Sequence, residues 1–573
     1  MKFGGVRFIA VIGFAALWLS LAGKAIAGDF RDEFPTQYTE TPMGVNLQTG
    51  KFRFGMFTFA LGPFVTQRGF GQSGFSFYGR IWWRSIPTAT GASQPTLTVS
   101  IGPGFGAIGT GATSSKMDFY SSNGSSFIWW SSSSVGHRLI REISGYRLTD
   151  RSGNSFIFED TYSSGYITPN GRLKYIEYAN GSKLEIDYDS QGRTQFVKSN
   201  QGYAVRFEYD QSYIKVCGFN LSATYATPAT SCSSSSYFVT LNGTTLSDGS
   251  LKITSIVDLV GQTSTVNYNS SGMMQCITLP NSLTCEFTNT YGALPGELPQ
   301  MYKADQVRIQ VDANGNTYHY DYENPELYNG DDPPQYPGGP LLQTAAWFSG
   351  PGYGAEARYE AGLLKTLQAP GGGPSSFGYD GVNLKKATYP EGNNIVITRD
   401  WVGNALTVVE NPKPGSGDPV LTRTQAFPIP NLYGNPSLCN AASDKLCDKP
   451  INQVDARGNQ TDYTYDPAHG GVLTKTLPPV QVDAAGTTIR PQVRYEYAQR
   501  YAWIKNSSGG YVQASTPIWL MVRERTCRKT AASGQTCAGG AADEVITDYD
   551  YGPNSGPNNL LLRGVAVTAD GQT

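Results

Sequence analysis

Charge and histidine are scarce in this 573-residue chain, and each scarcity excludes a class of function. Charged residues make up 16% and the formal net charge is -2, so no basic field would attract nucleic acid. There are only three histidines and no C-x-x-C pair, whereas a zinc site needs thiolates or imidazoles clustered at short spacing. We therefore expect no nucleic-acid partner, no metal and no cofactor.

Motifs that carry catalysis are also missing. The chain has no G-x-S-x-G, H-E-x-x-H or P-loop, and the G-x-G-x-x-G match at residues 104–109 precedes a polar segment with no helical pattern. His319 lies between two tyrosines on the polar face of an expected strand, and His137 and His469 adjoin glycines in expected surface loops. A general base needs a nucleophile or an orienting acid within reach, and no such set is recognisable. We therefore expect that the protein is not an enzyme.

Long apolar runs are confined to the N-terminus. Lys2 and Arg7 precede an apolar run at residues 8–22, and residues 25–27 read Ala-Ile-Ala, a pattern typical of a signal peptide cleaved after Ala27. An uncleaved anchor, the alternative, would need a run of roughly 20 residues. No later segment is apolar enough to cross a bilayer. We expect a signal peptide at 1–27 and export to the periplasm, the cell surface or the medium.

The cysteines agree with an oxidising compartment. Sequence alone leaves their connectivity open, but each couple of neighbours would close a short loop, which favours local disulfides. The candidate pairs are Cys217 with Cys232, Cys276 with Cys285, Cys439 with Cys447, and Cys527 with Cys537.

Glycine and tyrosine are abundant, with 66 and 35 residues, and they follow a pattern. In "KLEIDYDSQGR" (residues 183–193) Leu184, Ile186 and Tyr188 alternate with polar residues, as expected for a strand with one buried face. Alternation ending in Tyr-Asp recurs at Tyr209 and, with variants, along the rest of the chain.

A second element, Asp three residues before Gly, lies between these strands. It predicts a type I turn in which the Asp side chain accepts backbone N–H groups and Gly takes a positive φ. One unit of strand, turn, strand and turn repeats about every 20 residues, which indicates an extended repeat architecture. The repeat-defining residues are Tyr188, Asp189, Gly192, Tyr209, Asp210, Asp258, Gly261, Asp312, Gly315, Tyr320, Asp321, Asp455, Gly458, Tyr465 and Asp466.

The segment "YDSQGRTQFVKSNQGYAVRFEYD" (residues 188–210) and "VDARGNQTDYTYD" (residues 454–466) resemble the tyrosine-aspartate, or RHS (rearrangement hotspot), repeat. The resemblance runs from about Gly171 to the end, and "MGVNLQTGKFRFGMFTFALGPF" (residues 43–64) is similar to the segment that opens many bacterial RHS proteins. In that family the repeats wind into a hollow shell that commonly holds a C-terminal toxin domain, as in polymorphic toxins, toxin complexes and teneurins.

The resemblance implies an all-β fold, with extended antiparallel β-hairpin repeats forming a spiral sheet, an open or partial shell, after a small N-terminal β region. We expect that region at 28–165 and the repeats at 166–573. Asp570-Gly571 is a hairpin signal with one arm missing, so we expect the front part of a longer protein. The implied function is a non-catalytic shell whose partner is its own C-terminal effector.

Tryptophan pairs suggest an alternative. Adjacent residues of a strand face opposite sides, so one indole of each pair would face away from the core and offer a flat surface for a sugar ring, unless both faces are covered. The candidate glycan contacts are Trp82, Trp83, Trp129 and Trp130. The protein would then be a cell-surface adhesin with the repeats as a stalk. Asp331 and Asp332, in a turn-rich insertion, are expected in a solvated loop rather than a calcium site.

Overall fold

The fold was analysed in a computed structural model of the whole chain. The residues that it describes are 41, 44–47, 50–71, 79–87, 93–101, 115–120, 128–131, 138–142, 145–159, 171–245, 251–298, 302–323, 345–351, 353–360, 363–369, 371–380, 383–400, 403–428, 445–528, 530–533 and 536–569.

These residues form β-strands and two short 3-10 turns, η1 (Cys232–Ser234) and η5 (Ala541–Asp543), and contain no α-helix. Accordingly, no helix in the described ranges has the length and apolar character to span a membrane. The strands before the repeats are β1 (Arg53–Leu61), β2 (Phe64–Gly71), β3 (Gly79–Pro87), β4 (Ser93–Ile101), β5 (Ser115–Tyr120), β6 (Ile128–Ser131), β7 (Arg138–Glu142), β8 (Gly145–Thr149) and β9 (Ser155–Glu159).

The repeat strands follow in chain order. The first set is β10 (Gly171–Glu177), β11 (Lys183–Tyr188), β12 (Thr194–Ser199), β13 (Tyr203–Tyr209), β14 (Tyr213–Asn220), β15 (Phe238–Thr245), β16 (Leu251–Val257), β17 (Thr263–Tyr268), β18 (Met274–Thr278), β19 (Phe287–Tyr291), β20 (Val307–Asp312), β21 (Thr317–Glu323), β22 (Ala345–Gly350), β23 (Tyr353–Glu360) and β24 (Leu363–Gln368). The second set is β25 (Pro374–Asp380), β26 (Asn383–Thr388), β27 (Asn394–Arg399), β28 (Ala405–Asn411), β29 (Leu421–Ala426), β30 (Asn452–Val454), β31 (Gln460–Tyr465), β32 (Val472–Thr476), β33 (Val480–Gln481), β34 (Thr488–Ile489), β35 (Gln492–Arg500), β36 (Trp503–Lys505), β37 (Tyr511–Gln513), β38 (Ile518–Cys527), β39 (Ala532–Ser533), β40 (Thr536–Cys537), β41 (Glu544–Asp550) and β42 (Gly564–Ala569).

One antiparallel sheet contains most of these strands, and neighbours in the chain are neighbours in the sheet. Strand β10 pairs with β9, β11 and, through Gly171 and Arg172, with β3, so the strands from β3 to β10 close a local ring. From β10 the sheet runs on to β42, with β33–β34, β36–β37 and β39–β40 as hairpins outside the main ladder. The all-β spiral sheet is confirmed, and its backbone ladder is continuous across the expected boundary between residues 165 and 166.

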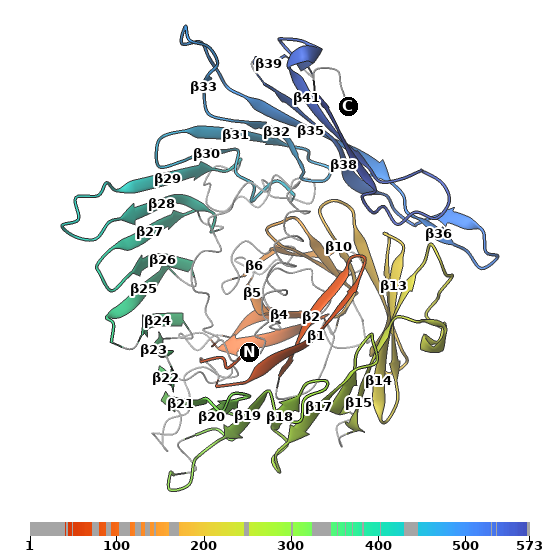
Figure 1. Cartoon of the computed structure of the whole chain (residues 1–573), viewed down its shortest axis with the longest axis vertical. Helices are drawn as coiled ribbons and strands as arrows, with labels where there is room; N and C mark the ends of the chain where they lie inside the picture. Colours follow the sequence, from red (N-terminus) through yellow and green to blue (C-terminus); the bar gives the residue numbers. More distant parts are fainter. Residues whose placement is uncertain are drawn as a thin grey trace, which may run out of the picture.

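The sheet curves around the N-terminal strands, and its concave face holds the main core. Figure 1 shows β1 and β2, in red and orange, inside the curve that the repeat strands describe. The core joins N-terminal side chains to a continuous row from the repeats, among them Phe52, Phe207, Phe287 and Tyr320, each at most 2% exposed. Because each hairpin alone would be marginal in water, this shared layer is what stabilises the repeats.

The convex face of β12 to β15 is covered as well, which differs from the expected wet face. Phe196, Ala204 and Cys217 are at most 1% exposed and pack with Cys232 and Ile504 in a second core. The loop between β14 and β15, tied down by a disulfide, provides part of this cover. Local alternation therefore identifies the concave side chains but not this added layer.

Candidate functional site

The turns of the repeat form as the Asp-x-x-Gly spacing predicts. At Asp189 the Oδ1 atom accepts hydrogen bonds from the Gln191 and Arg193 N–H groups, both at 2.9 Å, and the Gly192 N–H donates to the Asp189 carbonyl oxygen at 2.9 Å. Gly192 has a φ of +76°, which any side chain would disfavour. The same backbone bond closes the turns at Asp258, Asp312 and Asp455.

The repeat tyrosines hold neighbouring strands together through their hydroxyl groups. In each case the hydroxyl donates to a backbone carbonyl oxygen 15 residues earlier, on or just before the adjacent strand. The pairs are Tyr188 to Leu173 at 2.5 Å, Tyr209 to Thr194 at 2.8 Å, Tyr268 to Ile253 at 2.6 Å, Tyr379 to Leu364 at 2.8 Å, and Tyr465 to Pro450 at 2.7 Å. Burial raises the pKa of Tyr268 and of Tyr379 to about 12, so both remain hydrogen-bond donors at neutral pH.

A cation lies over the ring of each of these tyrosines, one strand earlier in the chain. The pairs, with distances to the ring centroid, are Arg172 over Tyr188 at 4.7 Å, Arg193 over Tyr209 at 4.2 Å, Lys252 over Tyr268 at 4.5 Å, Lys365 over Tyr379 at 5.7 Å, and Lys449 over Tyr465 at 5.6 Å. Sequence reasoning found the tyrosines but missed both partners. A basic residue 16 positions before the tyrosine, in every pair except Lys365 and Tyr379, is the signal that could have shown the second.

Tyr320, one of the predicted repeat tyrosines, has a different role. Its ring is 2% exposed and its hydroxyl donates to Gln310 Oε1 at 3.0 Å, just as Tyr463 donates to Gln453 Oε1 at 2.9 Å. Tyr320 is therefore the counterpart of Tyr463, and the position equivalent to Tyr465 is Tyr322. Because tyrosines alternate along β21, the sequence pattern placed the repeat tyrosine at Tyr320, two residues before its true position at Tyr322.

The concave face of the sheet contacts the N-terminal segment at several points. The Val307 N–H donates to the Gly50 carbonyl oxygen at 2.9 Å, and the rings of Phe52 and Phe287 pack edge to face with centroids 4.7 Å apart. Gly62, in the turn between β1 and β2, has a φ of +57°, and a Cβ there would lie 2.3 Å from the Tyr203 ring. The enclosing sheet and its contents thus fit closely.

The far end of the chain returns to the first repeats. Asn559 donates to the carbonyl oxygens of Gln201 and Gly202 at 3.1 and 2.7 Å, and the Lys505 N–H donates to the Leu221 carbonyl oxygen at 2.8 Å. We call these contacts, between residues 180–222 and 503–559, the seam. The seam also includes the backbone N–H of Trp519, which donates to the Asn180 carbonyl oxygen at 2.8 Å.

The seam brings β36 and β38 beside β10 and β13 (Figure 1). Among the described residues it consists of loop and side-chain contacts rather than a ladder between two named strands. The sheet thus encircles its contents while its hydrogen-bonded ladder stays open.

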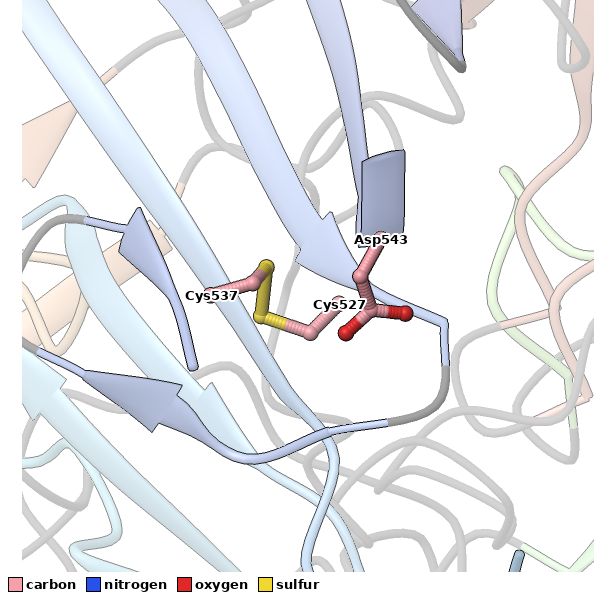
Figure 2. A group of neighbouring side chains, drawn as sticks. All are labelled: Cys527, Cys537 and Asp543. Carbon is pink, nitrogen blue, oxygen red and sulfur yellow. A yellow bond between two sulfur atoms is a disulfide. The ribbon is translucent and has the colours of Figure 1, made fainter. Parts of the chain in front are cut away.

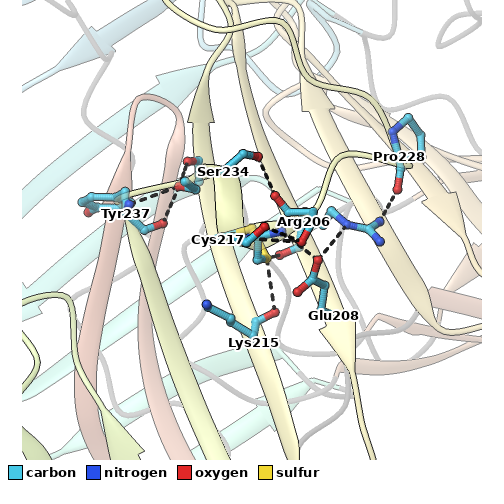
Figure 3. The surroundings of a disulfide bond; sticks show 12 residues. Arg206, Glu208, Lys215, Cys217, Pro228, Ser234 and Tyr237 are labelled. Atoms are coloured by element: carbon cyan, nitrogen blue, oxygen red, sulfur yellow. Dashed lines mark hydrogen bonds and ion pairs between the residues drawn. A yellow bond between two sulfur atoms is a disulfide. The ribbon is translucent and has the colours of Figure 1, made fainter.

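Disulfides reinforce loops on the rim and outside of the sheet. The bonded pairs are Cys217–Cys232, Cys276–Cys285 and Cys527–Cys537, and Cys447 is also disulfide-bonded, whereas Cys439 lies outside the described residues. Around the first, the Arg206 guanidinium bonds the Pro228 carbonyl oxygen, and Glu208 accepts from the Cys232 N–H at 2.7 Å (Figure 3).

Cys527, Cys537 and Asp543 are, in the described part of the chain, a group of metal-ligand type, but Figure 2 shows the two sulfur atoms bonded to each other. Asp543 accepts hydrogen bonds from the Thr530 N–H at 2.9 Å and the Thr530 hydroxyl at 2.5 Å. Because both sulfur atoms are in the disulfide, the group has no thiolate that could bind a metal, and its role is structural.

The three histidines have different outcomes. His319 is exposed, as the alternation of β21 predicts. The prediction of a surface histidine is wrong for His469, which is 4% exposed and lies between the rings of Tyr497 and Trp519, with centroids 4.4 and 4.8 Å away. Its neighbour Gly470 does lie in a turn, but the aromatic residues of β35 and β38 cover that turn. His137 lies outside the described residues.

Several other sequence predictions also fall outside the description. Trp82 and Trp83 are on β3 and Trp129 and Trp130 on β6, but the description stops at the backbone of these strands. The signal peptide at 1–27, the glycine loop at 104–109, Asp331, Asp332, Asp570 and Gly571 lie outside the described residues.

Comparison with known proteins gives a distant likeness. No family model matches the sequence, and no curated protein matches it. Among solved structures, the chain is similar to the crystal structure of TcdB2-TccC3 without its hypervariable C-terminal region, with a TM-score of 0.30 and 11% identity over 85% of this chain. It is also similar to the crystal structure of TcdB2-TccC3, with a TM-score of 0.29 and 11% identity over 93% of this chain. The chain spans 26% and 30% of those two chains.

Proposed function

We propose that this chain is an exported, non-catalytic scaffold, the shell part of a polymorphic toxin or effector system that encloses or presents a C-terminal effector. The observation that carries the proposal is the seam, where Asn559 bonds Gly202 and so joins the last hairpins to the first ones around an enclosed N-terminal segment. The resemblance of residues 188–210 to the RHS repeat supports it.

The build of the seam suits this role. Each of its hydrogen bonds is individually modest, about 0.5–1.5 kcal/mol, so the ring can open there without unzipping a strand pair. The concave face is a continuous apolar layer, which would hold a segment that is not itself water-soluble. The disulfides suit a shell that works in an oxidising compartment outside the cytoplasm.

The experiment begins with the reading frame downstream of the codon for Thr573. We expect further repeats there, followed by an effector domain. In the longer gene product, limited proteolysis should leave a C-terminal fragment protected by the folded shell and degraded once the shell is unfolded. A C-terminal fragment that is cleaved as fast with the shell folded as with it unfolded would refute enclosure. A frame that ends at Thr573 would remove the effector from the proposal.

A further inference from the structure

A groove of about 490 Å³ crosses the convex face of the sheet at β21 to β24. Its floor is a row of directly opposed residues, one from each strand, in the order Asp321, Trp347, Glu356 and Gln368. Four adjacent strands set about 14 Å between the ends of this row. The row faces away from the core, because Tyr320 and Tyr322, which alternate with Asp321, are buried on the concave side.

An aromatic residue stands at the centre of this row with polar groups on both sides. Trp347 is partly exposed, and its opposed neighbours are the carboxylates of Asp321 and Glu356. His319 and Ser349, both exposed and opposed to each other, form the next row of the groove. An apolar plane is thus framed by carboxylate, amide, imidazole and hydroxyl groups.

An arginine of the protein lies beside each carboxylate of the groove. Glu356 forms an ion pair of 2.7 Å with Arg358, and Asp321 accepts the Tyr302 hydroxyl at 2.8 Å and lies 3.5 Å from Arg308. Arg308 itself is 5% exposed. Arg308 also pairs with Glu297, so three carboxylates face two arginines and the surplus negative charge disfavours an acidic ligand. The carboxylate oxygens still have lone pairs to accept hydrogen bonds.

Arg308 also gives the groove a fixed end. Its guanidinium binds both carboxylate oxygens of Glu297, at 2.7 and 3.0 Å, and its Nε–H donates to the Tyr320 carbonyl oxygen at 2.8 Å. This bidentate pair holds the loop that carries Leu294 against the sheet, where Leu294 lines the groove. The opposite end is the turn at Gly371.

We propose that this groove binds a neutral oligosaccharide. One sugar ring stacks its C–H face on the Trp347 indole, and its hydroxyl groups donate to the Asp321 and Glu356 carboxylates and bond the Gln368 amide. The indole suits a ligand with an apolar face and a polar edge. A basic peptide would bind through charge instead of through the indole face, and the salt dependence measured below separates the two. This site is separate from the predicted Trp82 and Trp130 contacts and does not depend on the shell function.

The test is a glycan array of neutral and acidic oligosaccharides probed with the full chain, followed by calorimetric titration of the best neutral binder at low and high salt. We expect binding that is insensitive to salt. Trp347→Ala should weaken it at least about tenfold, as for a central aromatic contact, and Trp347→Phe should retain part of it. The control Tyr225→Ala removes an aromatic residue that is 46% exposed elsewhere and should change nothing.

A second variant keeps the result decisive if Trp347→Ala lowers folding stability. Ser349 is exposed, so Ser349→Tyr should leave the thermal midpoint unchanged while its ring fills the groove and blocks binding. Absence of any bound glycan would overturn the proposal, as would equal binding by Ser349→Tyr. Binding that disappears at high salt would assign the groove to a charged ligand instead.

Discussion

The side-chain amide of Asn559 donates a 2.7 Å hydrogen bond to the backbone carbonyl oxygen of Gly202, which precedes it by 357 residues. The contact is close, since a Cβ on Gly202 would lie 2.6 Å from the Asn559 Nδ2 atom. Together with the Lys505 and Trp519 backbone bonds, this side chain joins residues 503–559 to the first repeats. This relationship turns a row of hairpins into an enclosure.

Replacing Asn559 with alanine should loosen the seam without unfolding the hairpins. The variant loses the bonds to Gln201 and Gly202, at a cost of about 1–3 kcal/mol, although the Gly202 carbonyl oxygen keeps its bond from the Leu221 N–H. Hydrogen exchange should show faster exchange of the Lys505 and Trp519 amides. The matched control is Asn459→Ala, in an exposed turn, which should leave both amides unchanged.

Tyr209→Phe should isolate the role of the repeat hydroxyl. The ring keeps its stacking on Phe207 and the Arg193 guanidinium, but the bond to the Thr194 carbonyl oxygen is lost. Chemical denaturation should show a loss of about 0.5–1.5 kcal/mol. Tyr511→Phe, on an exposed hairpin, should stay within about 0.5 kcal/mol of the wild type. Equal stability of Tyr209→Phe and Tyr511→Phe would mean that the hydroxyl bond contributes nothing.

Local chemistry explains what could be predicted from sequence. The Asp189 turn and the alternation that buries Phe207 depend on residues only a few positions apart, so both can be predicted from a short stretch of sequence. The bond from Tyr209 to Thr194 needs the strand register, and the seam between Asn559 and Gly202 needs the curvature of the whole sheet. Neither leaves a local signal, and the groove around Trp347 likewise requires four strands in register.

Removing the disulfide between Cys217 and Cys232 should destabilise the outer cover of β12 to β15. The bond closes a separation of 15 residues, and loss of such a cross-link costs about 3 kcal/mol. In the variant that carries Cys217→Ala and Cys232→Ala, proteases should therefore cleave the loop that begins at Leu221 more readily. The matched control, the double alanine variant of Cys276 and Cys285, frees a shorter, more exposed loop with a separation of 9 and should cost less. Equal sensitivity of the two variants would contradict the covering role.

His469 should make the protein less stable in acid. Burial lowers the pKa of its imidazole below the ordinary 6.5, assisted by Lys445 and Lys449 and opposed by Asp466. The unfolded chain therefore binds a proton at a higher pH than the folded one. The stability due to neutral His469 is complete above about pH 6.5 and is lost as the pH falls below that value.

The measurement compares urea unfolding of the wild type and of His469→Gln between pH about 7.5 and about 5. Glutamine keeps an acceptor for the Gly471 N–H, which bonds His469 Nδ1 at 3.1 Å, but it does not titrate. Buried Asp150 and Asp400, whose pKa values burial raises, act with the opposite sign and are common to both proteins. The wild type should lose more stability across this range than the variant. Parallel pH profiles would show that His469 is protonated as readily in the folded protein as in the unfolded one.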